Sequence, residues 1–548
     1  MELSDEIFSP GITRLKLEQA ILPAYVGRAR WFGGKARTPK GFTVLAAPAL
    51  GNARLLLVRI DYADGATETY LVPLQMAAYD AARIGYDHPE AVATRTSDGG
   101  ILFDAIHDEA FRCALYSLAM TGGSQAGGTE LVGLPGHVPP DLTEAPPSRV
   151  LAVEQSNSSA VYGDRVFLKL YRRLEEGMNP DAEILRFLSN HGFTHAPPFF
   201  GAVEFRSAGS EPHGEGAGGG KERGEPYGGG AGGEKERGEP RVIALALGMV
   251  PNEGDAWAFA LAELQKYYAR SLAEGFDASP FAGLSRLDLT PAPEEAVSLV
   301  GHEFLSRARQ LGLRTGELHL ALASDEGGPD FAPEPFGERD RLALASAIRG
   351  EGKRVLDLLA ERRAALPSEL ANSVAALAET APRFDETAGR LAAAAHLATA
   401  RTRTHGDYHL GQVLNTGDDF VILDFEGEPA RSLAERRLKR SPLRDVAGML
   451  RSFHYAAHSA VSKLGERRAF AEPLGELWAA TVSRAFLEGW LSQTAGAPFV
   501  PSPPADLLQL LEAFLLEKAL YEIAYELNNR PTWVGIPLRG ILSLLRGG

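Results

Sequence analysis

The stretch His405-Gly406-Asp407-Tyr408-His409-Leu410-Gly411-Gln412 decides the interpretation of this chain, together with Val421-Ile422-Leu423-Asp424-Phe425-Glu426 downstream. Asp407 and Gln412 are five residues apart, and Asp424 ends a short apolar run typical of a buried strand. A carboxylate can orient an attacking hydroxyl group and accept its proton, and carboxylate and amide oxygens can hold Mg²⁺ against nucleotide phosphates. The pattern predicts a phosphoryl-transfer site with Asp407 as catalytic base and Gln412 and Asp424 as metal ligands.

This spacing resembles that of the protein kinases. There the base aspartate is followed five residues later by an amide ligand, and then by the metal-binding aspartate of Asp-Phe-Gly. Here the amide is Gln412 instead of the usual asparagine, and Asp424 begins Asp-Phe-Glu. Glutamine still offers a carbonyl oxygen, one methylene further from the backbone. A polar surface loop is the plain alternative, but three suitable residues at these spacings favour the catalytic interpretation.

A kinase of this type also needs a lysine on an upstream strand, paired with a glutamate on a helix. Lys169 lies inside the apolar segment 166–171, where an unpaired charge would be costly. Glu183 follows fourteen residues later, in a predicted helix that opens with Asn179-Pro180-Asp181, an N-cap residue followed by proline. We therefore expect Lys169 and Glu183 to pair at the nucleotide site.

The turn before this strand occupies the place of a glycine-rich phosphate loop. Its amide, hydroxyl and backbone groups can donate to phosphate oxygens. The residues expected to bind the phosphates are Gln155, Ser156, Asn157 and Ser158. The strand exit at 247–252 stands where a hinge for adenine is expected, with Met249 and Val250 as the contacts. An ordinary polar turn and an ordinary strand exit are the alternatives.

The predicted secondary structure is β-rich first and helical afterwards. Turn residues separate expected strands at 42–47, 54–62, 67–72, three within 149–171, 199–205 and 241–248. A helix is expected at 104–120 and mostly loop at 121–147. After residue 250, apolar positions recur at helical spacing in 256–274, 296–323, 340–365, 370–400, 442–463 and 505–529. A β-like stretch at 412–425 interrupts these helices.

Residues 207–240 form a low-complexity segment. GAGGGKERGEP at 216–226 is repeated as GAGGEKERGEP at 230–240, with Gly220 replaced by Glu234. Such a sequence cannot bury enough apolar surface to offset the entropy lost on ordering. We expect a disordered insertion in a hairpin between the strands at 199–205 and 241–248.

The charge balance limits the classes of partner. The chain has 56 Lys and Arg against 71 Asp and Glu, a formal net charge of -15, which disfavours nucleic acid and anionic membranes as partners. The basic run at 436–440 is expected to be a solvated or substrate-proximal loop. Cys113 is the single cysteine, which excludes an intrachain disulfide. No signal peptide or membrane-spanning run is apparent, so a cytoplasmic protein is expected.

Further segments resemble the aminoglycoside-phosphotransferase-like kinases and, within them, the bacterial maltokinases. They are WFGGK at 31–35, EQSNS at 154–158, GDAW at 254–257, SPLRDVAGML at 441–450 and YEIAYELNNRPTWVGI at 521–536. The resemblance implies an α+β, bilobal protein-kinase-like fold. It further implies a β-rich cap subdomain at 1–90, an intermediate subdomain at 91–250 that completes the N-lobe, and an α-helical C-lobe at 251–548.

The resemblance also implies an activity. ATP, with Mg²⁺, would phosphorylate the anomeric hydroxyl of maltose to give maltose 1-phosphate for α-glucan and glycogen synthesis. Glucosamine kinases share much of the architecture, which leaves 6-phosphorylation of glucosamine open. An aminoglycoside phosphotransferase is less favoured because of the N-terminal cap-like segment, and an inactive kinase-like protein because the catalytic set is intact. Association with a trehalose-isomerising enzyme is left open.

The C-terminal helix independently suggests a sugar. Glu517, Tyr521 and Tyr525 lie four residues apart on one predicted face. Carboxylates accept hydrogen bonds from sugar hydroxyls, and aromatic faces pack against pyranose rings. The expected substrate contacts are His409, Glu426, Tyr521, Tyr525, Glu526 and Trp533. The alternative is a helix with tyrosines in the core and glutamates in a solvated stripe.

Overall fold

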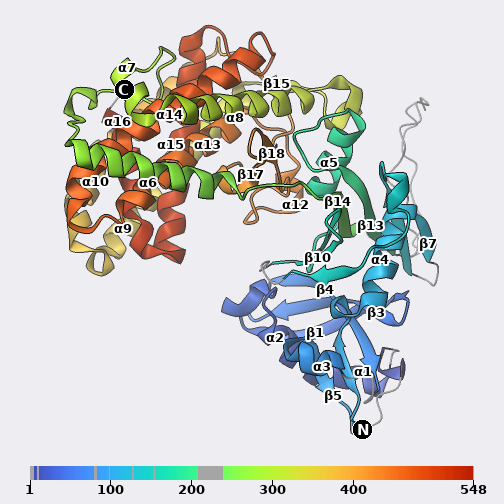
Figure 1. Cartoon of the computed structure of the whole chain (residues 1–548). Coiled ribbons are helices and arrows are strands. Elements are labelled where there is room, and N and C mark those ends of the chain that lie inside the picture. The colour runs from blue at the N-terminus through green and yellow to red at the C-terminus, as the bar shows by residue number, and fades with distance from the viewer. Residues whose placement is uncertain are drawn as a thin grey trace, which may run out of the picture. The chain divides into compact units, whose positions relative to one another are not determined.

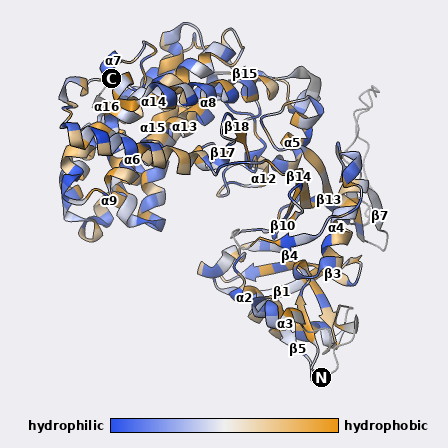
Figure 2. Ribbon diagram, viewed as in Figure 1, coloured by the Kyte–Doolittle hydropathy of each residue, from blue (hydrophilic) through white to orange (hydrophobic). Residues whose placement is uncertain are grey.

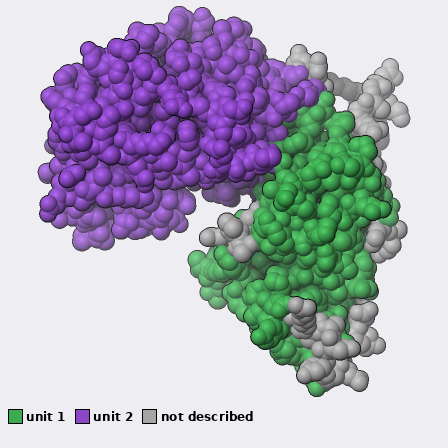
Figure 3. Space-filling view, viewed as in Figure 1, with its two compact units in different colours: residues 1–190, 197–249 green, residues 191–196, 250–548 purple. Residues whose placement is uncertain are grey.

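The structure, a computed structural model, describes residues 5–8, 11–78, 83–97, 99–125, 129–151, 156–207 and 239–546. The chain forms two compact units (Figure 3). Unit 1 contains Met1–Asn190 and Pro197–Met249, and unit 2 contains His191–Ala196 and Val250–Gly548. Unit 1 holds two antiparallel sheets and unit 2 is mainly helical (Figure 1). The predicted α+β class, β-rich first and helical later, is confirmed.

The first sheet of unit 1 has the strand order β1-β3-β4-β6-β5, with β2 paired to β3 and β12 to β4. The strands are β1 (Pro39–Ala46), β2 (Ala49–Leu50), β3 (Ala53–Tyr62), β4 (Thr67–Ala77), β5 (Val92–Arg95), β6 (Ile101–Asp104) and β12 (Arg173–Leu174). The three strands predicted in the first 90 residues correspond to β1, β3 and β4.

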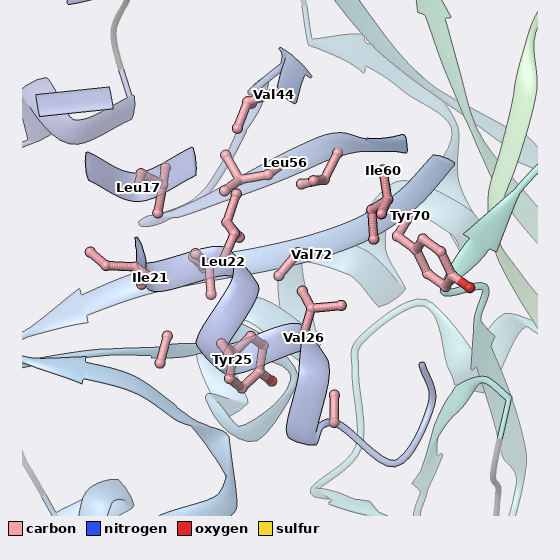
Figure 4. Packing of buried hydrophobic residues seen from close by; sticks show 14 of the residues in the cluster. Leu17, Ile21, Leu22, Tyr25, Val26, Val44, Leu56, Ile60, Tyr70 and Val72 are labelled. Carbon is pink, nitrogen blue, oxygen red and sulfur yellow. The ribbon is translucent and has the colours of Figure 1, made fainter. Parts of the chain in front are cut away.

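Short N-terminal helices cover one face of this sheet. They include α1 (Ile12–Lys16) and α2 (Leu22–Arg28), and the short helix α3 (Arg83–Asp87) follows β4. Leu22 and Val26 pack with Leu56 and Val72 in one buried cluster (Figure 4). Each such side chain contributes about 1.5–3 kcal/mol when it is fully buried. The apolar strands therefore form a core with the first helices of the chain.

The second sheet has the order β7-β8-β13-β14-β11-β10-β9. The strands are β7 (Gly123–Gln125), β8 (Thr129–Pro135), β9 (Ser148–Val150), β10 (Ser158–Tyr162), β11 (Val166–Leu170), β13 (Phe199–Ser207) and β14 (Arg241–Gly248). The strands predicted within 149–171 and at 199–205 and 241–248 are confirmed, and β13 pairs with β14. The predicted disordered insertion lies outside the described residues between 208 and 238.

The prediction of mostly loop at 121–147 missed β7 and β8, although it holds for 136–147 apart from a short 3-10 helix at Pro140–Leu142. Helix α4 (Glu109–Thr121) crosses this sheet very closely, and α5 (Pro180–Asn190) follows β12. A Cβ atom at Gly133 would lie 1.9 Å from the carbonyl oxygen of Leu118, and one at Gly201 would lie 2.0 Å from that of Ala119. Gly133, one of the glycines that indicated loop, is therefore required for contact between helix and sheet, as is Gly201 in β13.

Unit 2 is built from helices with apolar and hydrophilic residues interspersed along them (Figure 2). They are α6 (Ala256–Glu274), α7 (Glu294–Val300), α8 (His302–Ala321), α9 (Glu338–Glu361), α10 (Ala371–Thr380), α11 (Pro382–Ala393), α12 (Leu433–Arg436), α13 (Leu443–Val461), α14 (Arg468–Thr494), α15 (Pro504–Asn529) and α16 (Gly535–Arg546). Two two-stranded sheets accompany them: β15 (Glu334–Phe336) pairs with the distant β16 (Thr399–Arg401), and β17 (Val413–Asn415) forms a hairpin with β18 (Phe420–Ile422). Among the described residues, none of the helices is long and apolar enough to span a bilayer.

Several predicted helices need correction. The helix expected at 296–323 is two helices separated by Gly301, whose φ is 105°. The helix expected at 370–400 is α10 and α11, with Pro382 starting the second, followed by β16. Helices α14 and α16 were not predicted. Helix α14 is buried nearly all round, including Trp478 and Trp490, so it lacks the one-sided apolar stripe that indicates a surface helix.

Candidate active site

The loop that carries Asp407 is fixed by a buried carboxylate. Asp445, on α13, accepts hydrogen bonds from the backbone N–H groups of His405 (2.8 Å) and Gly406 (3.0 Å). His319 lies 3.1 Å from the same carboxylate, and Trp490 donates to the other ring nitrogen of His319 at 3.0 Å. Because Trp490 can only donate, the proton of the His319 ring is on the nitrogen that faces Asp445. Burial would raise the pKa of Asp445, but His319 outweighs it and holds that pKa below its ordinary value.

His405 joins the two halves of the motif. Its Nε2 lies 2.7 Å from the carbonyl oxygen of Leu423, and its Nδ1 accepts from the N–H of Asp407 at 3.4 Å. The carbonyl can only accept and the amide can only donate, so the ring is neutral with its proton on Nε2. The rings of Tyr408 and Phe425 contact it at centroid distances of 5.1 and 5.0 Å. His405 therefore sets the position of Asp407 relative to the strand that leads to Asp424.

Gln412 and Asp424 come together as predicted, with a hydrogen bond of 2.9 Å from the amide of Gln412 to the carboxylate. Asp424 has φ of 62°, and no other non-glycine residue in the described part of the chain has a positive φ. Such strain costs about 1–3 kcal/mol and is found preferentially at functional sites. A carboxylate oxygen of Glu426 lies within 4.8 Å of one of Asp424. Two carboxylates and an amide oxygen fit the preference of Mg²⁺ for oxygen ligands.

A cavity of about 1020 Å³ opens beside Asp407 within unit 2. Lys518, on α15, lies in its wall with its ammonium 3.7 Å from Asp407 and 3.9 Å from Glu428. Tyr521 lines the same wall and donates to Glu428 at 3.0 Å. Burial raises the pKa of the Tyr521 hydroxyl, and the Glu428 charge adds to the shift. The candidate base therefore faces a polar, charged cavity large enough for a small sugar.

Sequence reasoning missed Lys518, Glu428 and Asp445 as site residues. Lys518 is three residues before Tyr521, so helical spacing alone could have placed both at one site. Glu428 follows two residues after Glu426 and carried no signal of its own. Asp445 was noticed only as part of a family-like segment.

The other predicted sugar contacts lie elsewhere than the cavity wall. Tyr525 is 43% exposed and stacks on Tyr521 at a centroid distance of 6.2 Å. Glu526 is buried, and its carboxylate is held by Arg530 (2.6 Å) and the Tyr455 hydroxyl (3.3 Å). The Arg530 guanidinium lies over the ring of Trp533, 5.0 Å from its centroid. Of the four residues predicted on this part of the chain, only Tyr521 lines the cavity.

His409 and Glu426 also lie off the cavity wall. The Nδ1 of His409 accepts from the N–H of Gly411 at 3.0 Å and so caps the turn Leu410–Gln412. Burial lowers the pKa of the His409 ring. His409 thus stabilises the turn that contains Gln412, and Glu426 lies close to Asp424.

On unit 1, Lys169 lies on β11 opposite Ser159 of β10. Its ammonium is 3.5 Å from Asp181, and the Tyr171 hydroxyl donates to the same carboxylate at 3.1 Å. Asp181 is the second residue of α5, the helix on which Glu183 was the predicted partner. Glu183 is half-buried two residues further on, and its pairing with Lys169 stays a prediction.

The predicted phosphate loop is partly held by the protein itself. Arg172 donates its backbone N–H to Asn157 (3.3 Å) and its Nε–H to Ser158 (2.8 Å), and is itself buried against Asp104 at 2.8 Å. Ser156 is exposed, whereas Gln155 lies outside the described residues. Met249 and Val250 are half-buried, and the Met249 N–H donates to the carbonyl of Arg165 at 2.8 Å. Their role as nucleotide contacts stays a prediction.

Comparison with known proteins gives the family context. Residues 25–108 match the maltokinase N-terminal cap domain. Glucosamine kinase of Streptacidiphilus jiangxiensis is 23% identical over 404 residues, 72% of this chain and 73% of its own. Glucosamine kinase of Mycolicibacterium smegmatis is 25% identical over 409 residues, 73% and 80% of the two chains.

Solved structures agree on the fold. A glucosamine kinase in complex with glucosamine, ADP and inorganic phosphate matches 95% of this chain and 98% of its own, with a TM-score of 0.59 and 21% identity. A second crystal form of glucosamine kinase matches with a TM-score of 0.60, also at 21% identity, over 95% and 99% of the two chains. The predicted kinase-like fold with an N-terminal cap is confirmed.

The matching cap domain and the two curated kinase relatives support a phosphotransferase of the kinase class, and the roles predicted for Asp407, Gln412 and Asp424 stay predictions. Within that class the chain is related to the maltokinase-like kinases, whose superfamily includes the glucosamine kinases. The predicted family resemblance is confirmed, and the matches support a sugar kinase of this superfamily.

Proposed function

We propose that the chain is an ATP- and Mg²⁺-dependent kinase that phosphorylates the anomeric hydroxyl of maltose. The observation that carries the choice of sugar is the ion pair of Lys518 with Asp407, at 3.7 Å in the cavity wall. The matching maltokinase cap over residues 25–108 supports the same choice.

In this proposal Asp407 accepts the proton of the sugar hydroxyl as that oxygen attacks the γ-phosphate. The backbone bonds from Asp445 and His405 keep the loop in place, so orientation costs little during the reaction. Gln412, Asp424 and Glu426 would hold Mg²⁺, which offsets the phosphate charge when bound. Lys169 would orient the nucleotide phosphates from β11.

The charges of the cavity favour a neutral sugar over an amino sugar. Two carboxylates of the cavity wall are already engaged, Glu428 by Tyr521 and Lys518, and Glu517 by Arg444 at 2.7 Å. A protonated glucosamine would meet the ammonium of Lys518 beside the base. Two like charges about 4 Å apart repel by roughly 4 kcal/mol at an effective dielectric constant of 20, and the carboxylates of Asp407 and Glu428 beside Lys518 reduce this net repulsion. Maltose carries no charge and avoids this repulsion.

The second candidate is phosphorylation of glucosamine at its 6-hydroxyl. It is favoured by the two curated relatives, which are both glucosamine kinases and match over more than 70% of this chain. The cavity beside Asp407 has room for either sugar. The distinction therefore depends on charge at the wall and not on size.

Steady-state ADP release with a panel of acceptors tests the proposal. The full chain, ATP and Mg²⁺ are incubated with maltose, glucosamine, glucose or an aminoglycoside at equal concentrations. We expect kcat/KM for maltose to exceed that for glucosamine by at least about tenfold, a difference of about 1.4 kcal/mol. The reverse order would establish the glucosamine alternative.

The product proposed here suggests a cellular role. Maltose 1-phosphate made in the cytoplasm would serve α-glucan and glycogen synthesis, and a trehalose-isomerising enzyme would supply the maltose. Size-exclusion chromatography of the purified chain with such an enzyme tests whether the two associate. Separate elution at micromolar concentrations would mean that such an enzyme supplies maltose without forming a stable complex with this chain.

A further inference from the structure

The basic run at 436–440 turns out to border the cavity of Asp407. Arg437, Lys439 and Arg440 line it, together with Arg431 and Arg444 on either side of the run. The expectation of a substrate-proximal loop therefore has a structural counterpart. Two of these cations are neutralised by carboxylates, since Lys439 lies 2.9 Å from Glu334 and Arg444 lies 2.7 Å from Glu517.

In the part of the chain that the structure describes, Arg431 and Arg440 differ from Lys439 and Arg444 in having no carboxylate close to the guanidinium group. Among the described residues, no carboxylate lies within 4.0 Å of either guanidinium, and the guanidinium of Arg440 donates to the carbonyl oxygen of Glu435 at 3.4 Å. The Glu435 carboxylate is occupied by the backbone N–H and hydroxyl of Ser432, at 3.0 and 2.9 Å. Burial lowers the pKa of Arg440 to about 10, the like charges of Arg444 and Arg431 add to the shift, and the charges of Glu517 and Glu435 oppose it only in part. This part of the wall therefore has more positive charge than the protein itself neutralises.

We propose that Arg431, Arg440 and Arg444 form an anion subsite of the cavity, and that its ligand carries a phosphate group. Arg444 is balanced by Glu517, so the three side chains leave about two positive charges without a partner. A phosphate monoester carries about -1.5 to -2 at pH 7, whereas a carboxylate carries only -1. Guanidinium groups also match the oxygens of phosphate in pairs of parallel hydrogen bonds.

The ligand has two sources with this chemistry, inorganic phosphate and the phosphate ester of a sugar. The cavity of about 1020 Å³ extends from these arginines to Asp407 and Tyr521. A sugar ester could therefore bind with its phosphate on the arginines and its ring toward the base. The three arginines of the subsite belong to unit 2, whereas Lys169 belongs to unit 1.

Calorimetric titration of the full chain, without nucleotide or Mg²⁺, tests this subsite independently of the sugar that is phosphorylated. The titrants are glucose 1-phosphate, inorganic phosphate and glucose. We expect the ester or phosphate to bind and glucose to bind at least tenfold more weakly. Tighter binding of the ester than of phosphate assigns the ligand as a sugar phosphate, and equal binding assigns it as phosphate.

Four variants locate the binding. We take the anion, glucose 1-phosphate or inorganic phosphate, that binds the wild type more tightly. Arg431→Gln and Arg440→Gln should each weaken its binding by roughly tenfold, because each removes a pair of charge-assisted hydrogen bonds to the phosphate. Arg339→Gln, in the same cavity but exposed, and Lys169→Gln, at the predicted nucleotide site, should bind as wild type. Binding that survives in both cavity variants, or that is lost only with Lys169→Gln, would overturn the proposal, as would no binding by wild type.

If the arginine variants do not fold, the wild-type chain still gives an answer. Crystals soaked in tungstate, a heavy analogue of phosphate, should show an anomalous peak between Arg431 and Arg440. Peaks confined to other parts of the chain would contradict the subsite.

Discussion

The ammonium of Lys518 lies 3.7 Å from the carboxylate of Asp407, in the wall of the cavity that the candidate base faces. The lysine comes from α15, more than a hundred residues further along the chain. It places a positive charge beside the candidate base, where the proposed function puts the acceptor. In that proposal, the choice between a neutral and a cationic sugar depends on this contact.

Replacing Lys518 by glutamine should shift acceptor preference toward glucosamine. The change removes the charge but keeps similar length, so repulsion of an amino sugar disappears while the cavity keeps its shape. We expect the ratio of kcat/KM for glucosamine to that for maltose to rise by roughly tenfold or more. The exposed Lys463→Gln is the matched control. An unchanged ratio in Lys518→Gln would show that this lysine does not determine the preference between the two sugars.

Asp407→Asn should abolish turnover but leave nucleotide binding intact. Loss of a positioned base typically lowers the rate by about 10²–10⁴-fold. The measurement is kcat with saturating sugar, alongside the Kd of ATP by fluorescence or calorimetry. Asp418→Asn, on the exposed turn between β17 and β18, is the control for charge removal. Turnover by Asp407→Asn within about tenfold of wild type would rule out its role as base.

Asp424→Asn should raise the Mg²⁺ concentration that nucleotide binding requires, with little loss of stability. Asparagine tolerates the left-handed backbone that Asp424 adopts at φ of 62°, so the loop should keep its conformation. We expect the Mg²⁺ concentration for half-maximal ATP binding to rise at least tenfold. Asp424→Ala should show the same loss and also unfold more easily, by about 1–2 kcal/mol. Equal Mg²⁺ dependence in wild type and Asp424→Asn would remove Asp424 from the metal site.

The buried histidine pair on α13 should make the protein less stable in mild acid. His454 and His458 lie 3.1 and 2.9 Å from one oxygen of Glu476, whose other oxygen accepts from Arg286 at 3.0 Å. Burial lowers the pKa of His454 well below its ordinary value of 6.5, and the neighbouring His458 adds to the shift. Below pH 6.5 the unfolded chain therefore binds a proton that the folded chain does not, and stability falls as pH falls.

Urea unfolding at pH 7.0 and 5.5 measures this effect. One such proton corresponds to about 1.4 kcal/mol for each pH unit below the unfolded pKa. We expect a loss of roughly 1 kcal/mol that is reduced in His454→Gln and unchanged in His302→Gln, whose side chain is 71% exposed. The same carboxylate, Glu476, has its pKa held well below 4.5, because the adjacent histidines outweigh its burial. Its stabilising contribution should be lost only at lower pH. An identical pH dependence in His454→Gln would disprove the assignment.

The sequence predicted what depends on local spacing. Asp407, Gln412 and Asp424 lie within eighteen residues, and His405 and a short hairpin are enough to bring the last two together. Lys518 and Asp445 could not be found in this way, because their approach to the loop depends on how α13 and α15 pack. The same limit applies to the substrate residues. Helical spacing put Tyr521, Tyr525 and Glu526 near one another, but it could not reveal that Glu526 forms an ion pair with Arg530.

Errors in the fold have equally specific causes. Gly133 indicated a turn and so β8 was overlooked, yet Gly133, like Gly201 in β13, permits α4 to touch the sheet. Helix α14 carried no one-sided stripe because it is buried nearly all round. In both places the tertiary contact, absent from any short window of sequence, decides the local structure.

Phosphorus NMR of the product made from ATP and maltose tests the central claim most directly. We expect a single new phosphate resonance that couples to the proton on C1 of the sugar and disappears on mild acid treatment, as an anomeric phosphate does. The reaction should fail with Asp407→Asn. If maltose gives no product while glucosamine gives an acid-stable 6-phosphate, the chain is not a maltose kinase and the proposal is contradicted.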